Sequence, residues 1–217
     1  MGNIMEAVFC ILYLVFTGFL GIAMLVTAKG NFDRRFFGLL TVVLVAGDAF
    51  HLVPRIYGAL TNTMAEIYAA LGFGTLVTSV TMTIFYVMVW EFWRKRRNYS
   101  KISPVAIVFY VAAVVRIALC FFPQNAWLTE NPPLAWAIYR NIPFVLVGAI
   151  VVWRFWVDRK AEPHFKWAWL AITLSFAFYL PVVLFASEIP IVGMLMIPKT
   201  VCYVWFILMG YKATKKV

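Results

Sequence analysis

The sequence predicts an all-α membrane protein, a bundle of seven transmembrane helices in a single domain over residues 1–217. The composition is 64% hydrophobic and 13% charged, whereas a soluble domain has about 45–50% apolar and about 25% charged residues. The apolar residues form segments of about 20, the length that a helix needs to cross a bilayer. The basic residues fall in short runs between these segments, as in membrane proteins. That distribution argues against nucleic-acid binding in spite of the net charge of +10.

Each predicted span is a window of about 20 apolar residues that ends at a polar or proline-containing connection. In chain order the spans cover about residues 6–28, 36–58, 66–92, 104–123, 134–156, 166–187 and 190–211. The first lacks a preceding basic region and a following small-residue cleavage site, so we expect a span rather than a removable signal peptide. Only "ASEIP" (186–190) separates the last two, and its glutamate and proline favour a tight turn between helices.

The connections alternate in charge, and this predicts the orientation of the bundle. Fifteen of the nineteen Lys and Arg residues lie in segments 29–35, 93–101, 154–166 and 211–217. The connections at the other end, 1–6, 58–66, 123–133 and 187–190, contain no Lys or Arg. By the positive-inside rule we expect a multi-pass protein of the cell membrane, with its N-terminus outside and its C-terminus in the cytoplasm.

Four basic residues lie inside the predicted spans: Arg55, Arg116, Arg140 and Lys199. At about 1.5 Å of rise per residue, all four fall between the middle of the membrane and the predicted outer surface. In "GDAFHLVPR" (47–55), Asp48, His51 and Arg55 are spaced i, i+3, i+7 and share one helix face. Ionisable residues inside a membrane are costly, usually face the bundle interior and mark a functional site. The same halves carry uncharged polar groups, which are Tyr139, Asn141, Ser175, Tyr179, Thr200 and Tyr203.

Prolines also gather in the predicted outer halves of the helices. A proline inside a helix bends it and frees a backbone carbonyl, which neighbours or water in a cavity then satisfy. Bent outer halves around a polar cluster predict a cup that opens to the outside. The prolines concerned are Pro54, Pro123, Pro143, Pro181 and Pro198.

The charge balance of this cluster predicts what the cup binds. Only Asp48 offsets four cations inside the spans, with Glu66 and Glu188 at the rim. An unpaired buried charge is strongly destabilising, so the excess of cations indicates an anionic ligand: a phosphate, a carboxylate or a lipid head group. The expected ligand-binding residues are Asp48, His51, Arg55, Arg116, Arg140, Asn141, Tyr179, Lys199 and Tyr203.

Two roles are open for these residues. In the first, the cations hold the anion, and Asp48 and His51 tune the site or couple it to a proton, because the unperturbed pKa of histidine is about 6.5. In the second, the cluster is structural: Arg55 extends to the outer surface and Arg116 pairs with Asp48.

Seven helices, an outer N-terminus and a lysine near the middle of the last helix resemble the microbial rhodopsins. "SFAFYLPVVLFAS" (175–187) is similar to the sixth helix of that family. The resemblance implies that Lys199 carries retinal as a Schiff base. The chain departs from the family four residues before that lysine, where Leu195 replaces the usual acid, and in the third span, whose deep polar residues are Thr78, Ser79, Thr81 and Thr83.

Phe50-His51 resembles the "FH" pair in the second helix of alkaline ceramidase-like hydrolases, with Gly47 at their serine position. "GD" (47–48) before an aromatic-rich third helix looks like the lysoplasmalogenase family. Either resemblance implies a membrane-embedded lipid hydrolase, with Asp48 and His51 as candidate catalytic residues and His51 as general base.

The sequence predicts no metal site and no cofactor. The ceramidase-like family holds zinc with histidines of its second and seventh helices, but "KTVCYVWF" (199–206) has no histidine. A three-histidine zinc site cannot form from one intramembrane histidine. Cys10, Cys120 and Cys202 lie inside spans without a CxxC pair, which is typical of buried, unreactive thiols.

The function that these observations predict is binding of an anionic small molecule or lipid head group in an outward-facing basic cavity. The protein would act as a carrier or a sensor among membrane lipids, without a nucleic-acid partner. Lipid hydrolysis and retinal binding by Lys199 are the alternatives.

Overall fold

The computed structural model of the chain describes residues 2–61, 63, 66–99 and 102–215, and all regular structure within them is helical. The prediction of an all-α bundle is confirmed. The seven α-helices of the described residues are α1 (Gly2–Val26), α2 (Phe32–Thr61), α3 (Tyr68–Arg96), α4 (Pro104–Cys120), α5 (Leu134–Asp158), α6 (Ala168–Phe185) and α7 (Met196–Thr214). Three short 3-10 helices lie in the connections: η1 (Pro123–Asn125), η2 (Pro163–Phe165) and η3 (Pro190–Leu195).

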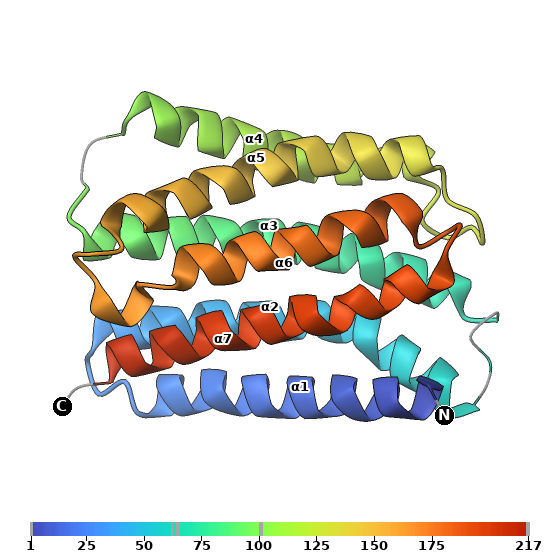
Figure 1. Cartoon of the computed structure of the whole chain (residues 1–217), viewed down its shortest axis with the longest axis horizontal. Helices are drawn as coiled ribbons and strands as arrows, with labels where there is room; N and C mark the ends of the chain where they lie inside the picture. Colours follow the sequence, from blue (N-terminus) through green and yellow to red (C-terminus); the bar gives the residue numbers. More distant parts are fainter. Residues whose placement is uncertain (1, 62, 64–65, 100–101, 216–217) are drawn as a thin grey trace.

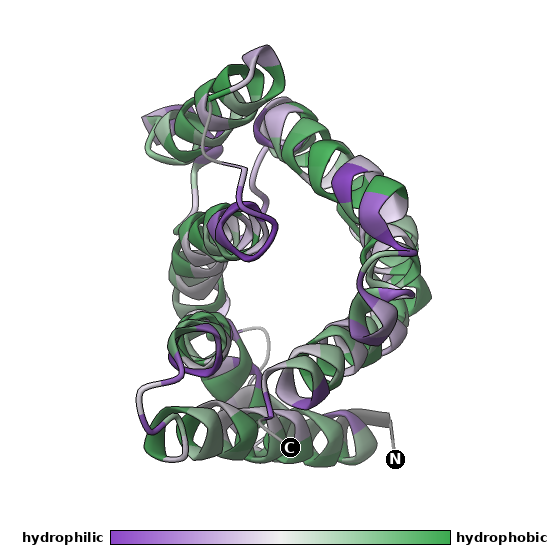
Figure 2. Cartoon of the chain, turned by 90° about the vertical axis from the view of Figure 1, so that its left-hand side faces the viewer, coloured by the Kyte–Doolittle hydropathy of each residue, from purple (hydrophilic) through white to green (hydrophobic). Residues whose placement is uncertain are grey.

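The helices form a closed ring in which each packs against the next one in sequence. Figure 1 shows α2, α3 and α4 in one layer and α5, α6 and α7 in another, with α1 along the open side. α7 returns to contact both α1 and α2, which closes the ring, seen end-on in Figure 2. The two chain termini lie at opposite ends of the bundle (Figure 1). We call these the N-end, where α1 begins, and the C-end, where α7 ends.

Six of the helical segments in the described residues are long and apolar enough to cross a membrane, so the chain is a multi-pass membrane protein. α4 has 17 residues, a length of about 25 Å, which is shorter than the bilayer core of about 30 Å. Its predicted span, 104–123, extended three residues too far. The residue before a proline is disfavoured in the α conformation, and Pro123 begins η1 instead.

The seventh helix also begins later than predicted. Residues 190–195 form η3, and the α-helix starts at Met196 rather than at Pro190. The remaining spans agree with the sequence to within four residues at each end, and Pro54, Pro143 and Pro181 lie inside α2, α5 and α6. Pro198 lies in the first turn of α7, where its missing N–H costs no helical hydrogen bond.

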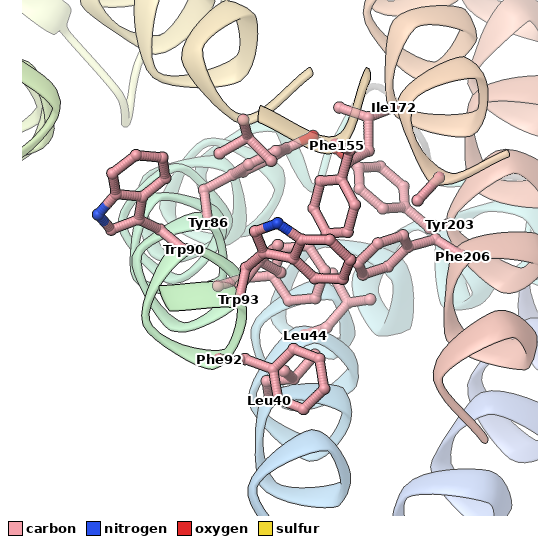
Figure 3. Packing of buried hydrophobic residues seen from close by; sticks show 14 of the residues in the cluster. Leu40, Leu44, Tyr86, Trp90, Phe92, Trp93, Phe155, Ile172, Tyr203 and Phe206 are labelled. Atoms are coloured by element: carbon pink, nitrogen blue, oxygen red, sulfur yellow. Dashed lines mark hydrogen bonds between the residues drawn. The ribbon is translucent and has the colours of Figure 1, made fainter. Parts of the chain in front are cut away.

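Aromatic side chains fill the bundle toward the C-end. Figure 3 shows Trp93 beside Phe155 and Phe206, with Trp90 on the opposite side of α3. The rings of Trp93 and Phe155 lie 4.3 Å apart between centroids, and Phe155 meets Phe206 at 5.8 Å. Buried aromatic pairs at such separations stabilise beyond the area they bury. The C-end half is therefore a packed core.

Ion pairs and hydrogen bonds link the helix ends and connections at the C-end. Arg96 of α3 binds Asp33 of α2 at 2.8 Å and Glu162, just before η2, at 3.0 Å. Asp158 at the end of α5 accepts hydrogen bonds from Trp93 Nε1 at 2.7 Å and from the Tyr99 hydroxyl at 3.0 Å. These contacts join four segments across the same end of the ring.

Small residues let α2 and α3 cross closely near the N-end. A Cβ atom on Gly74 would lie 2.7 Å from His51 Cα and against the carbonyl oxygen of Phe50. One turn further along α3, Thr78 donates a hydrogen bond of 3.0 Å to the carbonyl of Gly47. Glycine allows such backbone contact between membrane helices. The crossing fixes the position of His51 against α3.

Candidate ligand-binding cavity

A cavity of about 80 Å³ lies inside the ring in its N-end half. Side chains from six helices, α2 to α7, line it, which leaves α1 outside its wall. Polar and charged groups predominate, with Met82, Phe144 and Met196 as the apolar part. The lining residues are His51, Thr75, Thr78, Ser79, Met82, Arg116, Phe144, Tyr179, Met196 and Lys199.

Arg116 of α4 is the most deeply buried cation of this cavity, with 1% of its surface exposed. Nη1 donates a hydrogen bond of 2.7 Å to the carbonyl oxygen of Arg140 on α5. The guanidinium also lies over the ring of Phe144, 5.1 Å from its centroid. Nε is buried without a hydrogen-bond partner among the described residues. The guanidinium is thus held in place but not satisfied.

Lys199 of α7 contributes the second cation. Nζ lies 4.8 Å from the ring centroid of Tyr179 and 5.8 Å from that of Tyr203, both cation–π distances. In the part of the chain that the structure describes, no carboxylate oxygen lies within 4.0 Å of the charged groups of Lys199 or Arg116. The two tyrosine rings therefore contact this ammonium group but carry no negative charge to neutralise it.

His51 of α2 is oriented by α3. Its Nδ1 lies 3.2 Å from Oγ1 of Thr75, and that hydroxyl donates its one proton to the carbonyl of Leu71 at 2.8 Å. Nδ1 is consequently the donor to Thr75, which assigns a proton to Nδ1 and leaves Nε2 for another partner. His51 also borders a second, smaller cavity of about 40 Å³ between α1, α2 and α7.

Asp48 does not pair with His51 or Arg116 in the described structure. Its Oδ2 accepts a hydrogen bond of 2.6 Å from the hydroxyl of Tyr13 on α1. The arrangement in which Asp48 orients His51 as a general base is therefore not formed here. The structural pairing of Asp48 with Arg116 is not formed either.

The four intramembrane cations lie in three places rather than along one wall. Arg55 is paired with Glu6 of α1 beside the smaller cavity. Arg140 donates a hydrogen bond of 2.9 Å to Oδ1 of Asn125 and lies over the ring of Trp127 at 4.2 Å. Only Arg116 and Lys199 share the central cavity.

Arg140 faces a separate vestibule of about 250 Å³ at the N-end, between the start of α3 and the connection before α5. Thr75 lines both this vestibule and the central cavity. The vestibule and the central cavity therefore adjoin at Thr75. Glu66 and Glu188, predicted at the rim, are both exposed.

Three of the predicted uncharged residues, Asn141, Tyr179 and Tyr203, take part in two hydrogen-bonded pairs, the second of which includes Tyr86. The Tyr179 hydroxyl donates to Oδ1 of Asn141 at 2.8 Å, and the amide of Asn141 donates to the carbonyl of Ala137. The hydroxyl oxygens of Tyr203 and Tyr86 lie 3.1 Å apart. Of these four side chains, only Tyr179 is among the residues that line the cavity.

Sequence reasoning missed several residues that shape the site. Glu6 and Tyr13 are seven residues apart on α1, hence on one face, and they meet Arg55 and Asp48. Their position on one face of α1 was the feature of the sequence that could have indicated these contacts. Thr75 and Ser79 of α3 had no such feature, because hydroxyl residues are common in membrane helices.

The residues behind the three family resemblances can now be placed. Lys199 lies in a cavity of about 80 Å³ beside a second cation. His51 contacts a threonine and a backbone carbonyl. Among the described residues, no three His, Cys, Asp or Glu side chains lie together so that they could hold a metal ion. No protein-family model, no curated protein and no solved structure matches the chain.

Proposed function

We propose that the protein binds a small anion, such as phosphate or a carboxylate, between Arg116 and Lys199, and that it acts as a carrier or a sensor of that anion. The observation that carries the proposal is that two cations share one cavity while, in the described structure, no carboxylate oxygen lies within 4.0 Å of the charged group of either. With the predicted orientation, the cavity opens toward the outside.

Electrostatics favours an anion in this position. Removing a charge from water costs several kcal/mol unless a partner compensates it. Arg116 gains one hydrogen bond and one aromatic contact, and Lys199 lies against two aromatic rings. An anion between them would offset the desolvation of both cations, and Arg116 Nε, without a partner in the described residues, would supply a charge-assisted hydrogen bond.

The size of the cavity and its other donors suit a small ligand. A volume of about 80 Å³ holds a few waters at about 30 Å³ each, and it is far below the roughly 300–1,000 Å³ of drug-sized ligand sites. The hydroxyl of Ser79 makes no hydrogen bond with the described residues, and His51 keeps Nε2 available. A lipid would have to place only its head group here, through the vestibule.

The test is anion-dependent thermal unfolding of the purified full chain in phosphatidylcholine nanodiscs. Phosphate, sulfate and acetate are titrated at constant ionic strength with chloride as balance. Binding to the folded state alone raises stability by about 2.7 kcal/mol at a ligand concentration of 100 Kd. We expect one of these anions to stabilise the wild type, and Arg116→Gln or Lys199→Met to weaken its binding roughly tenfold or more, because each variant loses a contact with a charged group.

Arg55→Gln is the matched control, since it removes the same charge from a cation outside the cavity. It should keep the anion response of the wild type. The proposal fails if no anion stabilises the wild type, or if the cavity variants respond as the control does. Uptake of the bound anion into proteoliposomes then separates a carrier from a sensor.

A further inference from the structure

A large cavity lies at the C-end, away from the proposed anion site. It is a groove of about 460 Å³ between α3, α4 and α5. One side is aromatic and apolar, and the other is polar and basic. The lining residues are Trp90, Arg94, Asn98, Tyr99, Ser103, Val105, Trp153 and Arg154.

Arg154 of α5 presents its guanidinium edge to this groove. Its face lies on the ring of Tyr99, 3.9 Å from the centroid, and Nε lies 3.2 Å from Oδ2 of Asp158. Nη1 and Nη2 make no hydrogen bond with the described residues. Asp158 already accepts hydrogen bonds from Trp93 and Tyr99, so its charge is shared among three partners. The outer edge of Arg154 is left for an acceptor that the described residues do not supply.

Arg94 of α3 fixes a second positive charge on the facing wall. Its Nη1 donates to the Tyr110 hydroxyl at 2.9 Å and to Glu91 at 3.2 Å, and Nη2 donates to the carbonyl of Tyr99 at 3.3 Å. Three acceptors already hold this side chain, so a bound ligand would not have to reduce its conformational entropy further. Two oriented guanidinium groups are the side chains best suited to a phosphate.

Trp90, Val105 and Trp153 form the apolar part of the groove. Trp90, which is buried, stacks on Phe109 of α4 with ring centroids 4.8 Å apart, and Figure 3 shows it on the opposite side of α3 from Trp93. Trp153 is 48% exposed. Tryptophan near the end of a membrane helix lies at head-group depth. The groove thus has a basic wall and an aromatic wall. Its tryptophans favour the membrane depth at which lipid phosphates adjoin the acyl chains.

We propose that this groove binds an anionic phospholipid, with the lipid phosphate at Arg154 and Arg94 and the start of an acyl chain against Trp90 and Trp153. Basic pockets between membrane helices are suited to such head groups. The volume of about 460 Å³ exceeds that of a lone phosphate, and the apolar wall has no role for a soluble ion. This lipid site does not depend on the anion site at Arg116 and Lys199.

The experiment compares the full chain in nanodiscs of phosphatidylcholine with nanodiscs of phosphatidylcholine and phosphatidylglycerol in equal parts, by thermal unfolding. We expect phosphatidylglycerol to raise the unfolding midpoint of the wild type and Arg154→Gln to lose most of that increase. Arg159→Gln is the matched control, because Arg159 is at the same end but contacts Trp156 outside the groove. It should keep the increase. An equal increase in all three proteins overturns the proposal, since it reports net charge alone.

Two further experiments, one on fluorescence quenching and one with inorganic phosphate, test the proposal independently. Phosphatidylglycerol brominated near the head group should quench the tryptophan fluorescence of the wild type more than equally brominated phosphatidylcholine does. Equal quenching by the two lipids overturns the proposal even if Arg154→Gln does not fold. Inorganic phosphate, added to phosphatidylcholine nanodiscs, should stabilise Arg154→Gln as much as the wild type. A phosphate response that is lost in Arg154→Gln would assign the groove to a soluble anion instead.

Discussion

Tyr13 on α1 holds Asp48 on α2 through a hydrogen bond of 2.6 Å between its hydroxyl and Oδ2. The aspartate is one helical turn from His51, but its partner lies on α1, which does not line the central cavity. The acid therefore joins α1 to α2, and its oxygens lie more than 4.0 Å from the charged groups of Arg116 and Lys199. Anion binding between Arg116 and Lys199 depends on such a separation, because a carboxylate beside them would compete with the ligand.

We predict that Tyr13→Phe destabilises the protein. The substitution removes one hydroxyl and leaves a carboxylate without its donor, and a hydrogen bond to a charged group contributes about 1.5–3 kcal/mol. The unfolding midpoint in nanodiscs should fall accordingly. Tyr139→Phe is the control, because Tyr139 is exposed and its hydroxyl makes no hydrogen bond in the described residues. Equal midpoints for the two variants would contradict the importance of this bond.

The crossing of α2 and α3 leads to a second prediction, for Gly74→Ala. The added methyl group would lie 2.7 Å from His51 Cα and press on the carbonyl of Phe50, so the helices must separate. Overpacking of this kind typically costs about 1–3 kcal/mol. We expect a lower unfolding midpoint and, because His51 borders the central cavity, weaker anion stabilisation. The measurement is thermal unfolding with and without the stabilising anion.

Gly193→Ala is the matched control for that substitution. A Cβ atom on Gly193 meets nothing within 4 Å, so its effect should stay within about 0.5 kcal/mol. A loss of stability as large in Gly193→Ala as in Gly74→Ala would show that the helix crossing is not the cause.

The helices could be predicted from sequence because each is a long apolar window between polar connections. The end of α4 shows where this reasoning stops. Asn125 donates to the carbonyls of Leu119 and Cys120 at 2.7 and 3.4 Å, which caps the last turn of α4 three residues before the apolar window ends. The mean hydropathy of a window does not reveal such a cap. The 3-10 conformation of residues 190–195 escaped prediction for a similar reason, since they are as apolar as the α-helix that follows.

The composition of the site could be predicted only in part, because a membrane helix is apolar on both its lipid face and its inner face. Hydrophobic periodicity then does not fix how each helix is rotated about its axis. The depth of Arg116 and Lys199 followed from counting residues, but the contact of Arg55 with Glu6 depends on the rotation of α1. The contact of Arg140 with Asn125 depends on the conformation of a connection. Two of four predicted cations consequently have partners that the sequence did not reveal.

The third prediction concerns the orientation of the bundle, which the charges of the connections predict. Leu128, in the connection before α5, is 61% exposed at the N-end, and Ala161 is exposed at the C-end. Leu128→Cys should react with a membrane-impermeant maleimide in intact cells, whereas Ala161→Cys should react only after the membrane is opened. The unmodified chain is the control and should react in neither case, because Cys10, Cys120 and Cys202 are all buried. The reverse pattern would place the anion cavity toward the cytoplasm and the groove at Arg154 toward the outside, and it would mean that the basic connections do not set the topology.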